Sequence, residues 1–440
     1  MAKRASKRTP SSAVSSGDVV NTSVSSGPEA LLLAALARGG GSLETGRYLM
    51  TFREGMGDEG IKSLKAQNLR VADARDFSNQ AVSLEAAGDA DAMMFPELGI
   101  AVVGGAAFQA SGLSLDSELS AQGPVEIIEP EYFVFPQNSE YLRGFLSAAK
   151  TIAHDLGIVQ RTEESDEEID AQVLGATWGL TRCRVPQSSR SGAGIKVAVL
   201  DTGMDLDHPD FVGRPIVSQT FAGDPVQDLL GHGTHCIGTA CGPKAPSGTT
   251  PRYGIAFGAR IFVGKVLSNS GSGTGASVLA GINWAVAQRC EVISMSLGSQ
   301  SPVQAAYTNA GTAALRNGCL IIAAAGNSGT NTGAPANSPT IMSVASLDAT
   351  LSPSSFSNFG KIEIAAPGRD VFSSWPRPTR YKTISGTSMA TPHVAGCAAL
   401  WAQTSPSLRG MNLWRRLESS ARRLPLAASK VGAGLVQAPQ

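Results

Sequence analysis

Charged and aromatic side chains are scarce: Asp, Glu, Lys and Arg make up 16% of the 440 residues, and Phe, Trp and Tyr make up 6%. The formal net charge is zero, so bulk charge indicates neither nucleic acid nor an anionic membrane surface as a partner. No apolar run approaches the ~20 residues of a membrane-spanning helix. The first such run, residues 30–37, is short and far from the basic N-terminus, so no clear secretory signal is expected. Secreted and intracellular locations both stay open.

Cysteine is also infrequent, and no two cysteines form a C-x-x-C pair. A zinc site is therefore not expected. An even number of cysteines permits disulfides without requiring them, and spacing alone gives no connectivity. The six are Cys183, Cys236, Cys241, Cys290, Cys319 and Cys397.

What the chain has in abundance is small and apolar: 42% hydrophobic residues and 49 glycines indicate a globular protein with many tight turns. The length favours two domains. Residues 1–43, rich in Ser, Gly and Ala, are expected to be a disordered lead. Residues 44–136 follow a β-α-β-β-α-β order, with helices at 57–67 and 114–122, which predicts a small α+β domain. Residues 137–174 are expected to form a helical and acidic linker, where proteolysis tends to fall.

Residues 175–440 alternate near-continuous apolar strands with helical stretches. This pattern predicts an α/β domain with a mostly parallel sheet covered by helices on both faces. Active sites in such folds lie beyond the carboxyl ends of the strands. Asp201 directly follows the apolar strand at 195–200, so we expect it at that edge.

Three segments of this domain indicate nucleophilic catalysis: Asp201-Thr-Gly203, Gly231-His-Gly-Thr-His-Cys236 and Gly386-Thr-Ser-Met-Ala-Thr-Pro-His393. Taken singly, the Asp is typical of a turn and the Ser of a helix N-cap. Taken together they supply the hydroxyl, the imidazole that accepts its proton and the carboxylate that orients the imidazole. A serine at a helix start also gains from the positive end of the helix dipole, which favours a developing oxyanion.

These segments resemble the three signatures of the subtilisin family of serine endopeptidases (subtilases, peptidase family S8). The resemblance implies that Asp201 orients, that His232 is the general base and acid, and that Ser388 is the nucleophile forming an acyl-enzyme. Ala323-Ala-Ala-Gly-Asn327 is similar to the segment with the family's oxyanion asparagine. Removing such a donor costs about 3–4 kcal/mol of transition-state stabilisation.

The substrate cleft is also similar to that of the family. Two segments would pair with an extended peptide, one on each side, and a third would help to frame the primary pocket. Ser328 stands where some relatives carry an acidic residue, so broad cleavage after apolar or aromatic residues is expected. The expected cleft residues are Gly271, Ser272, Gly273, Ser296, Leu297, Gly298, Ala324, Ala325 and Gly326.

Two features leave alternatives open. Cys236, one helical turn beyond His232, occurs in the proteinase K branch; it is either a buried filler or functionally relevant. Asp205, Asp207 and Asp210 are either solvated surface carboxylates or part of a structural calcium site. Asp210 matches a calcium ligand in many relatives, but the loop at 242–254 differs from theirs. Catalysis itself is expected to need no cofactor.

The N-terminal domain resembles the family's propeptide, an intramolecular inhibitor and folding chaperone. Its closing strand, at 124–135, would carry a tail lying in the cleft as a product. Thr177-Trp-Gly-Leu180 resembles the start of mature enzymes, so self-processing is expected between 161 and 175. A monomer acting on protein or peptide substrates is implied, with neither nucleic acid nor membrane as partner.

Two other functions compete with the interpretation as a serine endopeptidase. An α/β-hydrolase needs G-x-S-x-G and the chain order Ser, Asp, His, and Gly386-Thr-Ser-Met-Ala lacks the second glycine. An inactive relative serving as a binding protein would be expected to lose a triad residue. An active fold held permanently latent by its N-terminal domain stays open.

Overall fold

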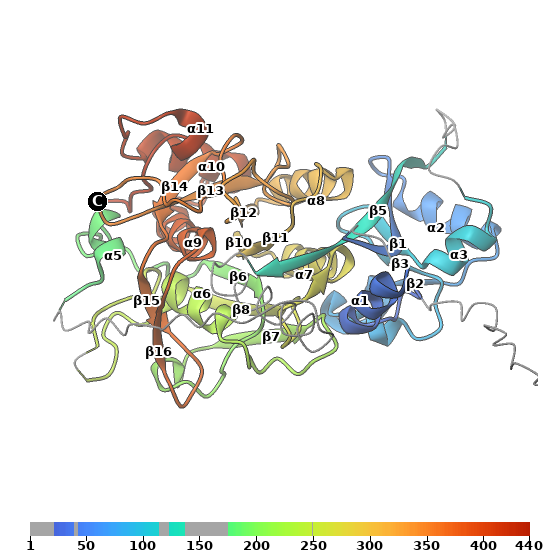
Figure 1. Ribbon diagram of the computed structural model, residues 1–440, viewed down its shortest axis with the longest axis horizontal. Helices are drawn as coiled ribbons and strands as arrows, with labels where there is room; N and C mark the ends of the chain where they lie inside the picture. Colours follow the sequence, from blue (N-terminus) through green and yellow to red (C-terminus); the bar gives the residue numbers. More distant parts are fainter. Residues whose placement is uncertain (1–21, 39–42, 114–122, 137–174, 249) are drawn as a thin grey trace, which may run out of the picture.

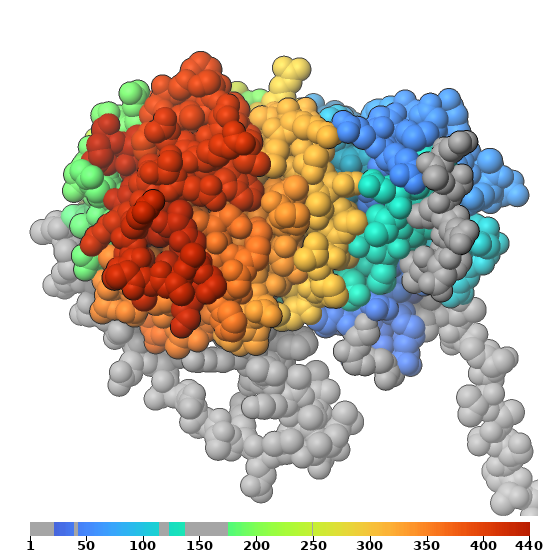
Figure 2. All heavy atoms as spheres, turned by 90° about the horizontal axis from the view of Figure 1, so that it is seen from above, coloured from blue at the N-terminus to red at the C-terminus, as the bar shows by residue number. Residues whose placement is uncertain are grey.

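The structure, a computed structural model, describes residues 22–38, 43–113, 123–136, 175–248 and 250–440. The chain forms two units that lie against each other, an N-terminal unit (22–136) and a C-terminal unit (175–440) (Figures 1 and 2). No helix in the described ranges is long and apolar enough to cross a membrane.

The C-terminal unit is built on a seven-stranded sheet whose neighbouring strands are all parallel. The prediction of a mostly parallel sheet is therefore confirmed. In sheet order the strands are β14 (Ile364–Pro367), β13 (Met342–Leu347), β12 (Leu320–Ala324), β10 (Val292–Met295), β6 (Lys196–Asp201), β8 (Arg260–Lys265) and β7 (Ile216–Thr220).

Helices cover both faces of this sheet, as the sequence predicted. On one face α6 (His232–Cys241) and α9 (Thr387–Thr404) share a core with alternate strand residues such as Val197. On the other face α7 (Gly275–Ala287) and α8 (Ala305–Arg316) form a second core. The smaller elements are α5 (Trp178–Arg182), η4 (Pro209–Phe211), β9 (Gly273–Thr274), β11 (Leu297–Gly298), the hairpin β15 (Val371–Ser374) and β16 (Tyr381–Ile384), α10 (Gly410–Ser420) and α11 (Ala428–Val431).

The N-terminal unit has a β-sheet in the order β5-β1-β4-β3-β2, and helices α2 and α3 pack against one face of it. Its second helix lies at Gly105–Ala110, earlier than predicted, while residues 114–122 lie outside the described part. The elements are β1 (Glu44–Phe52), α2 (Gly57–Ala66), β2 (Val71–Asp73), η1 (Ala74–Asp76), η2 (Ser78–Gln80), η3 (Leu84–Ala87), β3 (Ala92–Phe95), β4 (Ile100–Val103), α3 (Gly105–Ala110) and β5 (Val125–Pro136).

Side-chain alternation along these strands explains how the two units join. Met50 and its neighbours on one face pack against α2 and α3. Leu49, the adjacent residue, points the opposite way into the core of α7 and α8. The sheet of the N-terminal unit is thus buried on both sides, once by its own helices and once by the C-terminal unit.

The expectation of a disordered lead over residues 1–43 is wrong where the structure describes it. Residues Pro28–Ala37 form helix α1, whose Leu31 and Ala35 are buried against Phe133 of β5. Alanine and leucine are strong helix formers, and this tertiary contact stabilises a helix that the composition of the whole segment did not indicate. Residues 1–21 and 39–42 lie outside the described part, as does the predicted linker at 137–174.

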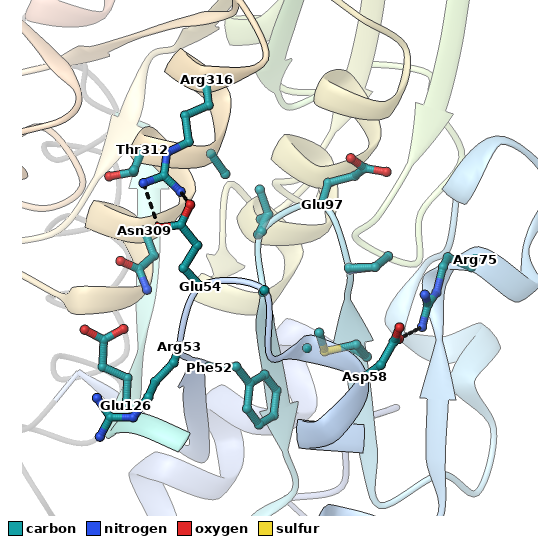
Figure 3. Close-up of a pocket in the computed structure, with 17 residues that line it drawn as sticks. Phe52, Arg53, Glu54, Asp58, Arg75, Glu97, Glu126, Asn309, Thr312 and Arg316 are labelled. Atoms are coloured by element: carbon teal, nitrogen blue, oxygen red, sulfur yellow. Dashed lines mark hydrogen bonds and ion pairs between the residues drawn. The ribbon is translucent and has the colours of Figure 1, made fainter. Parts of the chain in front are cut away.

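A cavity of about 560 Å³ lies where the two units meet, between the β1–α2 turn and α8. Figure 3 shows Glu54 of the turn pointing at Arg316 of α8, with which it forms an ion pair. The Arg316 side chain is 57% exposed and that of Glu54 is 74% exposed. Such an exposed pair contributes little to stability, so the apolar face described above carries most of the contact between the units.

Candidate active site

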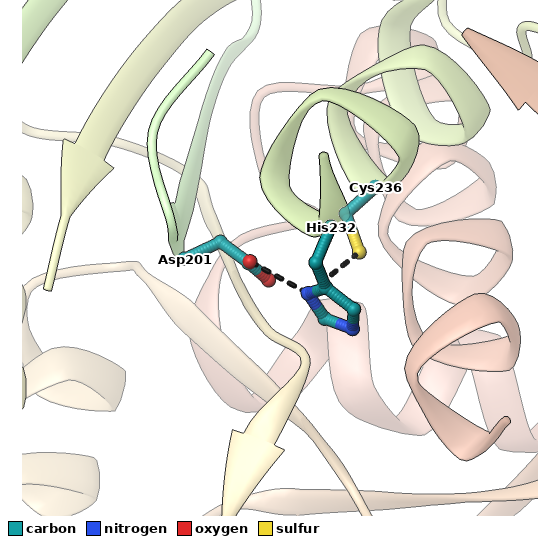
Figure 4. A group of neighbouring side chains, drawn as sticks. All are labelled: Asp201, His232 and Cys236. Atoms are coloured by element: carbon teal, nitrogen blue, oxygen red, sulfur yellow. Dashed lines mark hydrogen bonds and ion pairs between the residues drawn. The ribbon is translucent and has the colours of Figure 1, made fainter. Parts of the chain in front are cut away.

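Asp201 and His232 lie together at the carboxyl end of the parallel sheet. Asp201 is the last residue of β6, and His232 is the first residue of α6. His232 Nδ1 lies 2.6 Å from Asp201 Oδ1, and both side chains are almost fully buried (Figure 4). This contact directs Nδ1 toward the carboxylate and leaves Nε2, on the other side of the ring, without a hydrogen-bond partner among the described residues. A neutral imidazole held this way presents an acceptor at Nε2.

Ser388 belongs to the first turn of α9. Asn327 comes from the loop after β12 and contacts the start of the same helix. Ser388 Oγ donates to the carbonyl oxygen of Ser296 at 3.0 Å. Asn327 Oδ1 accepts from both the backbone N–H and the hydroxyl of Thr387 at 2.9 Å. Its amide Nδ2 is therefore turned the other way and has no partner in the part of the chain that the structure describes. A fixed, unpaired amide donor beside a serine at a helix N-terminus is the arrangement that stabilises an oxyanion.

Asp228 is a buried residue of this site that the sequence analysis missed. Its carboxylate accepts hydrogen bonds from the backbone N–H groups of Gly231 (2.8 Å) and Thr234 (2.9 Å) at the start of α6. It also accepts the hydroxyl of Thr202, at 2.9 Å, and the Thr202 hydroxyl in turn accepts the N–H of Gly233, at 2.8 Å. Asp228 thus ties the end of β6 to the start of α6. An Asp shortly before a helix start was the sequence signal that could have found it.

We expect Asp228→Asn to lower kcat roughly 10- to 100-fold with little change in KM, the size that small misplacements of catalytic groups produce. The amide replaces one acceptor oxygen with a donor facing N–H groups, so α6 shifts and the contact between Asp201 and His232 loosens. Steady-state kinetics on a peptide substrate measure kcat and KM separately. Asp207→Asn is the control, because that side chain is 80% exposed. A lowered melting temperature with unchanged kcat would show a purely structural role.

Comparisons with known proteins agree with this geometry. Residues 192–434 match the model of the Subtilase family (Peptidase_S8). The chain belongs to the subtilase family.

The matching relatives are proteases of known type. The chain is 38% identical over 280 residues to the alkaline protease of Shouchella clausii, covering 62% of this chain and 72% of that one. It is 39% identical over 266 residues to subtilisin Savinase of Lederbergia lenta, covering 59% and 96%. A crystal structure of a cold adapted subtilisin-like serine proteinase superposes with a TM-score of 0.54 at 35% identity, over 60% of this chain and 99% of that one. This subtilase is therefore a serine endopeptidase, acting on protein or peptide substrates.

Strand β5 of the N-terminal unit lies between the two segments that were predicted to bind an extended peptide. On one side Val134 pairs antiparallel with Gly273 of β9. On the other side Phe135 pairs with Gly298 and Pro136 with Leu297 of β11. Figure 1 shows β5 running out of its own sheet into the C-terminal unit. The cleft of this subtilase thus holds a stretch of its own chain in the extended conformation of a peptide.

The remaining predicted cleft residues shape the ends of this groove. Ser296 contacts Ser388, as described above, and Gly271 and Ser272 form the turn ahead of β9. Gly326 has a φ of +113°, and a Cβ there would come within 2.3 Å of Asn358 Nδ2, so only glycine fits. Ala324 and Ala325 are buried at the end of β12.

Cys236 fills the space beside the His232 imidazole. Its Sγ lies 3.9 Å from His232 Nδ1 and 3.7 Å from the carbonyl oxygen of Ser388. Burial raises the pKa of this thiol well above its ordinary value, and the charge of Asp201 adds to the effect. The thiol is therefore neutral and a poor nucleophile. All six cysteines are free and buried.

The contacts of Asp210 do not fit the calcium site that the resemblance implied. Its carboxylate accepts the hydroxyls of Tyr253 and Tyr381. Asp205 and Asp207 instead pair with the Arg377 guanidinium, at 2.8 and 3.2 Å. Both oxygens of Asp205 and one oxygen each of Asp207 and Asp210 are thus already engaged, which leaves few of the several oxygen ligands that a hard cation takes at once.

Proposed function

We propose that this subtilase is a self-processing serine endopeptidase with the triad Asp201, His232 and Ser388 and the oxyanion donor Asn327. The observation that carries the proposal is the extended strand β5, which is paired on both sides and ends opposite Leu297, the neighbour of the Ser296 that Ser388 contacts. A chain bound this way has its peptide plane fixed before reaction, which removes much of the entropic cost of catalysis.

The mechanism follows from the hydrogen bonds. His232 Nε2 takes the proton of Ser388 Oγ while Asp201 stabilises the imidazolium that forms. The Ser388 oxygen attacks the peptide carbonyl, and Asn327 Nδ2 together with the Ser388 backbone N–H bind the resulting oxyanion. His232 then gives the proton to the leaving amine, and water releases the acyl-enzyme by the same steps in reverse. In the structure Ser388 Oγ bonds to Ser296, so the hydroxyl rotates toward His232 before reaction.

A sulfonyl fluoride that modifies activated serines tests this proposal. We expect one label per folded chain, located by peptide mass on Ser388, with loss of casein hydrolysis in proportion to labelling. Denatured protein is the control and should take up no label, because an isolated serine hydroxyl is a weak nucleophile. A label on another residue, or labelling that leaves casein hydrolysis intact, would contradict the proposal.

The domain boundaries are part of the proposal. We place the inhibitory propeptide at 44–136, with α1 as an N-terminal extension, and the peptidase at 175–440. Two glutamates of β5 support this division. Glu129 accepts the backbone N–H groups of Ala305 and Ala306 at the start of α8, at 3.1 and 2.7 Å. Glu131 accepts that of Ala276 at the start of α7, at 2.7 Å, and its charge is balanced by Arg47.

We infer the first bond to be cut from where strand β5 ends. Its last residue, Pro136, faces Leu297, the residue after Ser296. Ser388 Oγ lies 3.0 Å from the Ser296 carbonyl oxygen. We therefore propose that the first cleavage falls directly after the described strand, between Gln137 and Asn138, which lie outside the described residues. The segment 161–175, where the sequence predicted maturation, lies outside the described residues and would be a second, later cut.

We expect intact mass and N-terminal sequencing of the purified chain to show a new N-terminus at Asn138. Gln137→Pro should slow this cut at least tenfold, because proline has no backbone N–H for main-chain hydrogen bonding in a substrate cleft and its ring restricts the backbone. Gln137→Ala is the matched control and should be cut at the normal rate. A first cut between 161 and 175, or normal cutting of the proline variant, would show that the register does not set the site.

A further inference from the structure

The loop ahead of β9 carries three serine side chains whose hydroxyls contact one another, and we call them the serine cluster (Ser268, Ser270 and Ser272). Ser268 Oγ lies 2.7 Å from Ser270 Oγ and 3.2 Å from Ser272 Oγ, and the last two oxygens are 2.9 Å apart. The backbone N–H of Ser268 donates to the carbonyl oxygen of Ser272 at 2.8 Å, which closes the loop and holds the three side chains together. The proposed mechanism does not use these hydroxyls.

A carboxylate of the N-terminal unit lies at the serine cluster. Ser270 Oγ donates to Glu29 Oε1 of α1 at 2.7 Å, and Ser272 Oγ donates to the same oxygen at 3.4 Å. Burial raises the pKa of Glu29, but hydrogen bonds from the serine cluster outweigh this effect, so the pKa lies below its ordinary value. The cluster therefore favours the ionised carboxylate, to which hydroxyl groups donate more strongly than to a neutral acceptor.

Opposite charges contact the same loop at Asn269. Lys265 donates to the side-chain oxygen of Asn269 at 3.0 Å, and the Asp224 carboxylate accepts the backbone N–H of Asn269 at 2.7 Å. These two charges offset each other. The preference for an anion at the serine cluster therefore comes from the hydroxyls.

The strand β5 shows where the serine cluster lies in the substrate groove. Val134 pairs with Gly273, the residue directly after the cluster, and its side chain packs into the core of the C-terminal unit. Phe133 and Phe135 point the other way and pack with Leu31 of α1. Helix α1, which carries Glu29, therefore covers the same face of the bound strand as these two aromatic side chains.

We propose that the serine cluster is a specificity site of the released enzyme, where its hydroxyls bind the carboxylate of a substrate Glu or Asp held at the position of Phe135. Glu29 occupies this site in the precursor. With the cut after Gln137, Phe135 corresponds to the third residue before the cleaved bond. The inference rests on the proposed function, because α1 and β5 leave the groove before a substrate enters it.

Mapping the cleavage sites in a peptide library by mass spectrometry tests the proposal. The self-processed wild-type chain is incubated with synthetic peptides in which Glu, Gln, Asp and Asn are equally frequent at every position. At the third residue before the cut, Glu and Asp should exceed Gln and Asn at least about threefold, since hydrogen bonds to ionised acceptors are the stronger ones. At the fourth residue, whose side chain points into the enzyme as that of Val134 does, no preference for the acids is expected.

Variants of Ser270, which lies at the exposed side of the serine cluster, locate the site. Ser270→Ala should bring the ratio of acid to amide close to one, whereas Ser270→Thr keeps a hydroxyl and should retain the preference. Ser405→Ala, at the far end of α9, is the matched control and should match the wild type.

The outcomes separate this inference from the proposed function. A wild-type ratio near one, an acidic preference only at another position, or a ratio unchanged in Ser270→Ala would each overturn the specificity site while peptide cleavage itself stands. If the chain cuts neither the library nor casein, the proposed function is wrong and the specificity site is overturned with it.

Discussion

Ser388→Ala is expected to abolish both casein hydrolysis and shortening of the chain. The alanine cannot form an acyl-enzyme, and the remaining groups can only bind and polarise a peptide. In subtilisin, loss of the nucleophile lowers kcat by about 10⁶-fold, and the residual rate comes from the oxyanion hole and substrate binding. We expect a loss of the same order here, because the described geometry supplies no second activated nucleophile: the thiol of Cys236 is buried and protonated.

Intact mass over time and casein hydrolysis measure this loss side by side. Ser405→Ala, which removes a hydroxyl at the other end of α9, is the matched control and should behave like the wild type. Mature wild-type enzyme added to the Ser388→Ala chain should cut it, which shows that the variant is still a competent substrate. If Ser388→Ala shortens by itself, the nucleophile lies elsewhere and the proposed triad is wrong.

Asp201→Asn is expected to lower the rate of self-cleavage and kcat by roughly 10⁴-fold, the effect of this exchange in other Asp-His-Ser enzymes. The structure gives the reason: Asp201 Oδ1 lies 2.6 Å from His232 Nδ1 in a buried site. An amide in this place can turn its NH₂ toward Nδ1, which then has to accept, so the proton moves to Nε2. The nitrogen that faces the substrate is then unable to act as a base.

The first-order rate at which intact precursor disappears measures this effect without added substrate. The rate should not depend on protein concentration, because the strand to be cut already lies in the cleft of the same chain. Asp207→Asn is the control, since it makes the same chemical change on an exposed side chain. A loss of less than tenfold in Asp201→Asn would mean that His232 keeps its tautomer without the carboxylate.

The sequence predicted those parts of the molecule that short segments determine by themselves. Asp201 follows an apolar strand and Ser388 begins an apolar helix, so motif and local structure could be placed together, and the parallel sheet followed from the repeated apolar strands. Asn327 was found through a contiguous segment, and the structure shows its amide fixed by Thr387.

The parts that escaped prediction depend on residues distant in the chain. The sequence left Asp210 as either a calcium ligand or a surface carboxylate, and its contacts with Tyr253 and Tyr381, which are distant in the chain, could not be predicted from it. Helix α1 depends on burial of Leu31 beside Phe133, and no local pattern indicates that contact. The register of β5 against β11 depends on pairing between strands that lie far apart in the chain.

The two glutamates of β5 have a consequence for the lifetime of the released enzyme. When the N-terminal unit departs, the N–H groups of Ala305 and Ala306 lose the carboxylate of Glu129, whereas α7 keeps its own capping box of Thr274 and Ser277. If maturation proceeds as proposed, the released enzyme would begin α8 with two backbone donors exposed to solvent, so this end of the helix is where we expect the enzyme to fray more readily than the precursor.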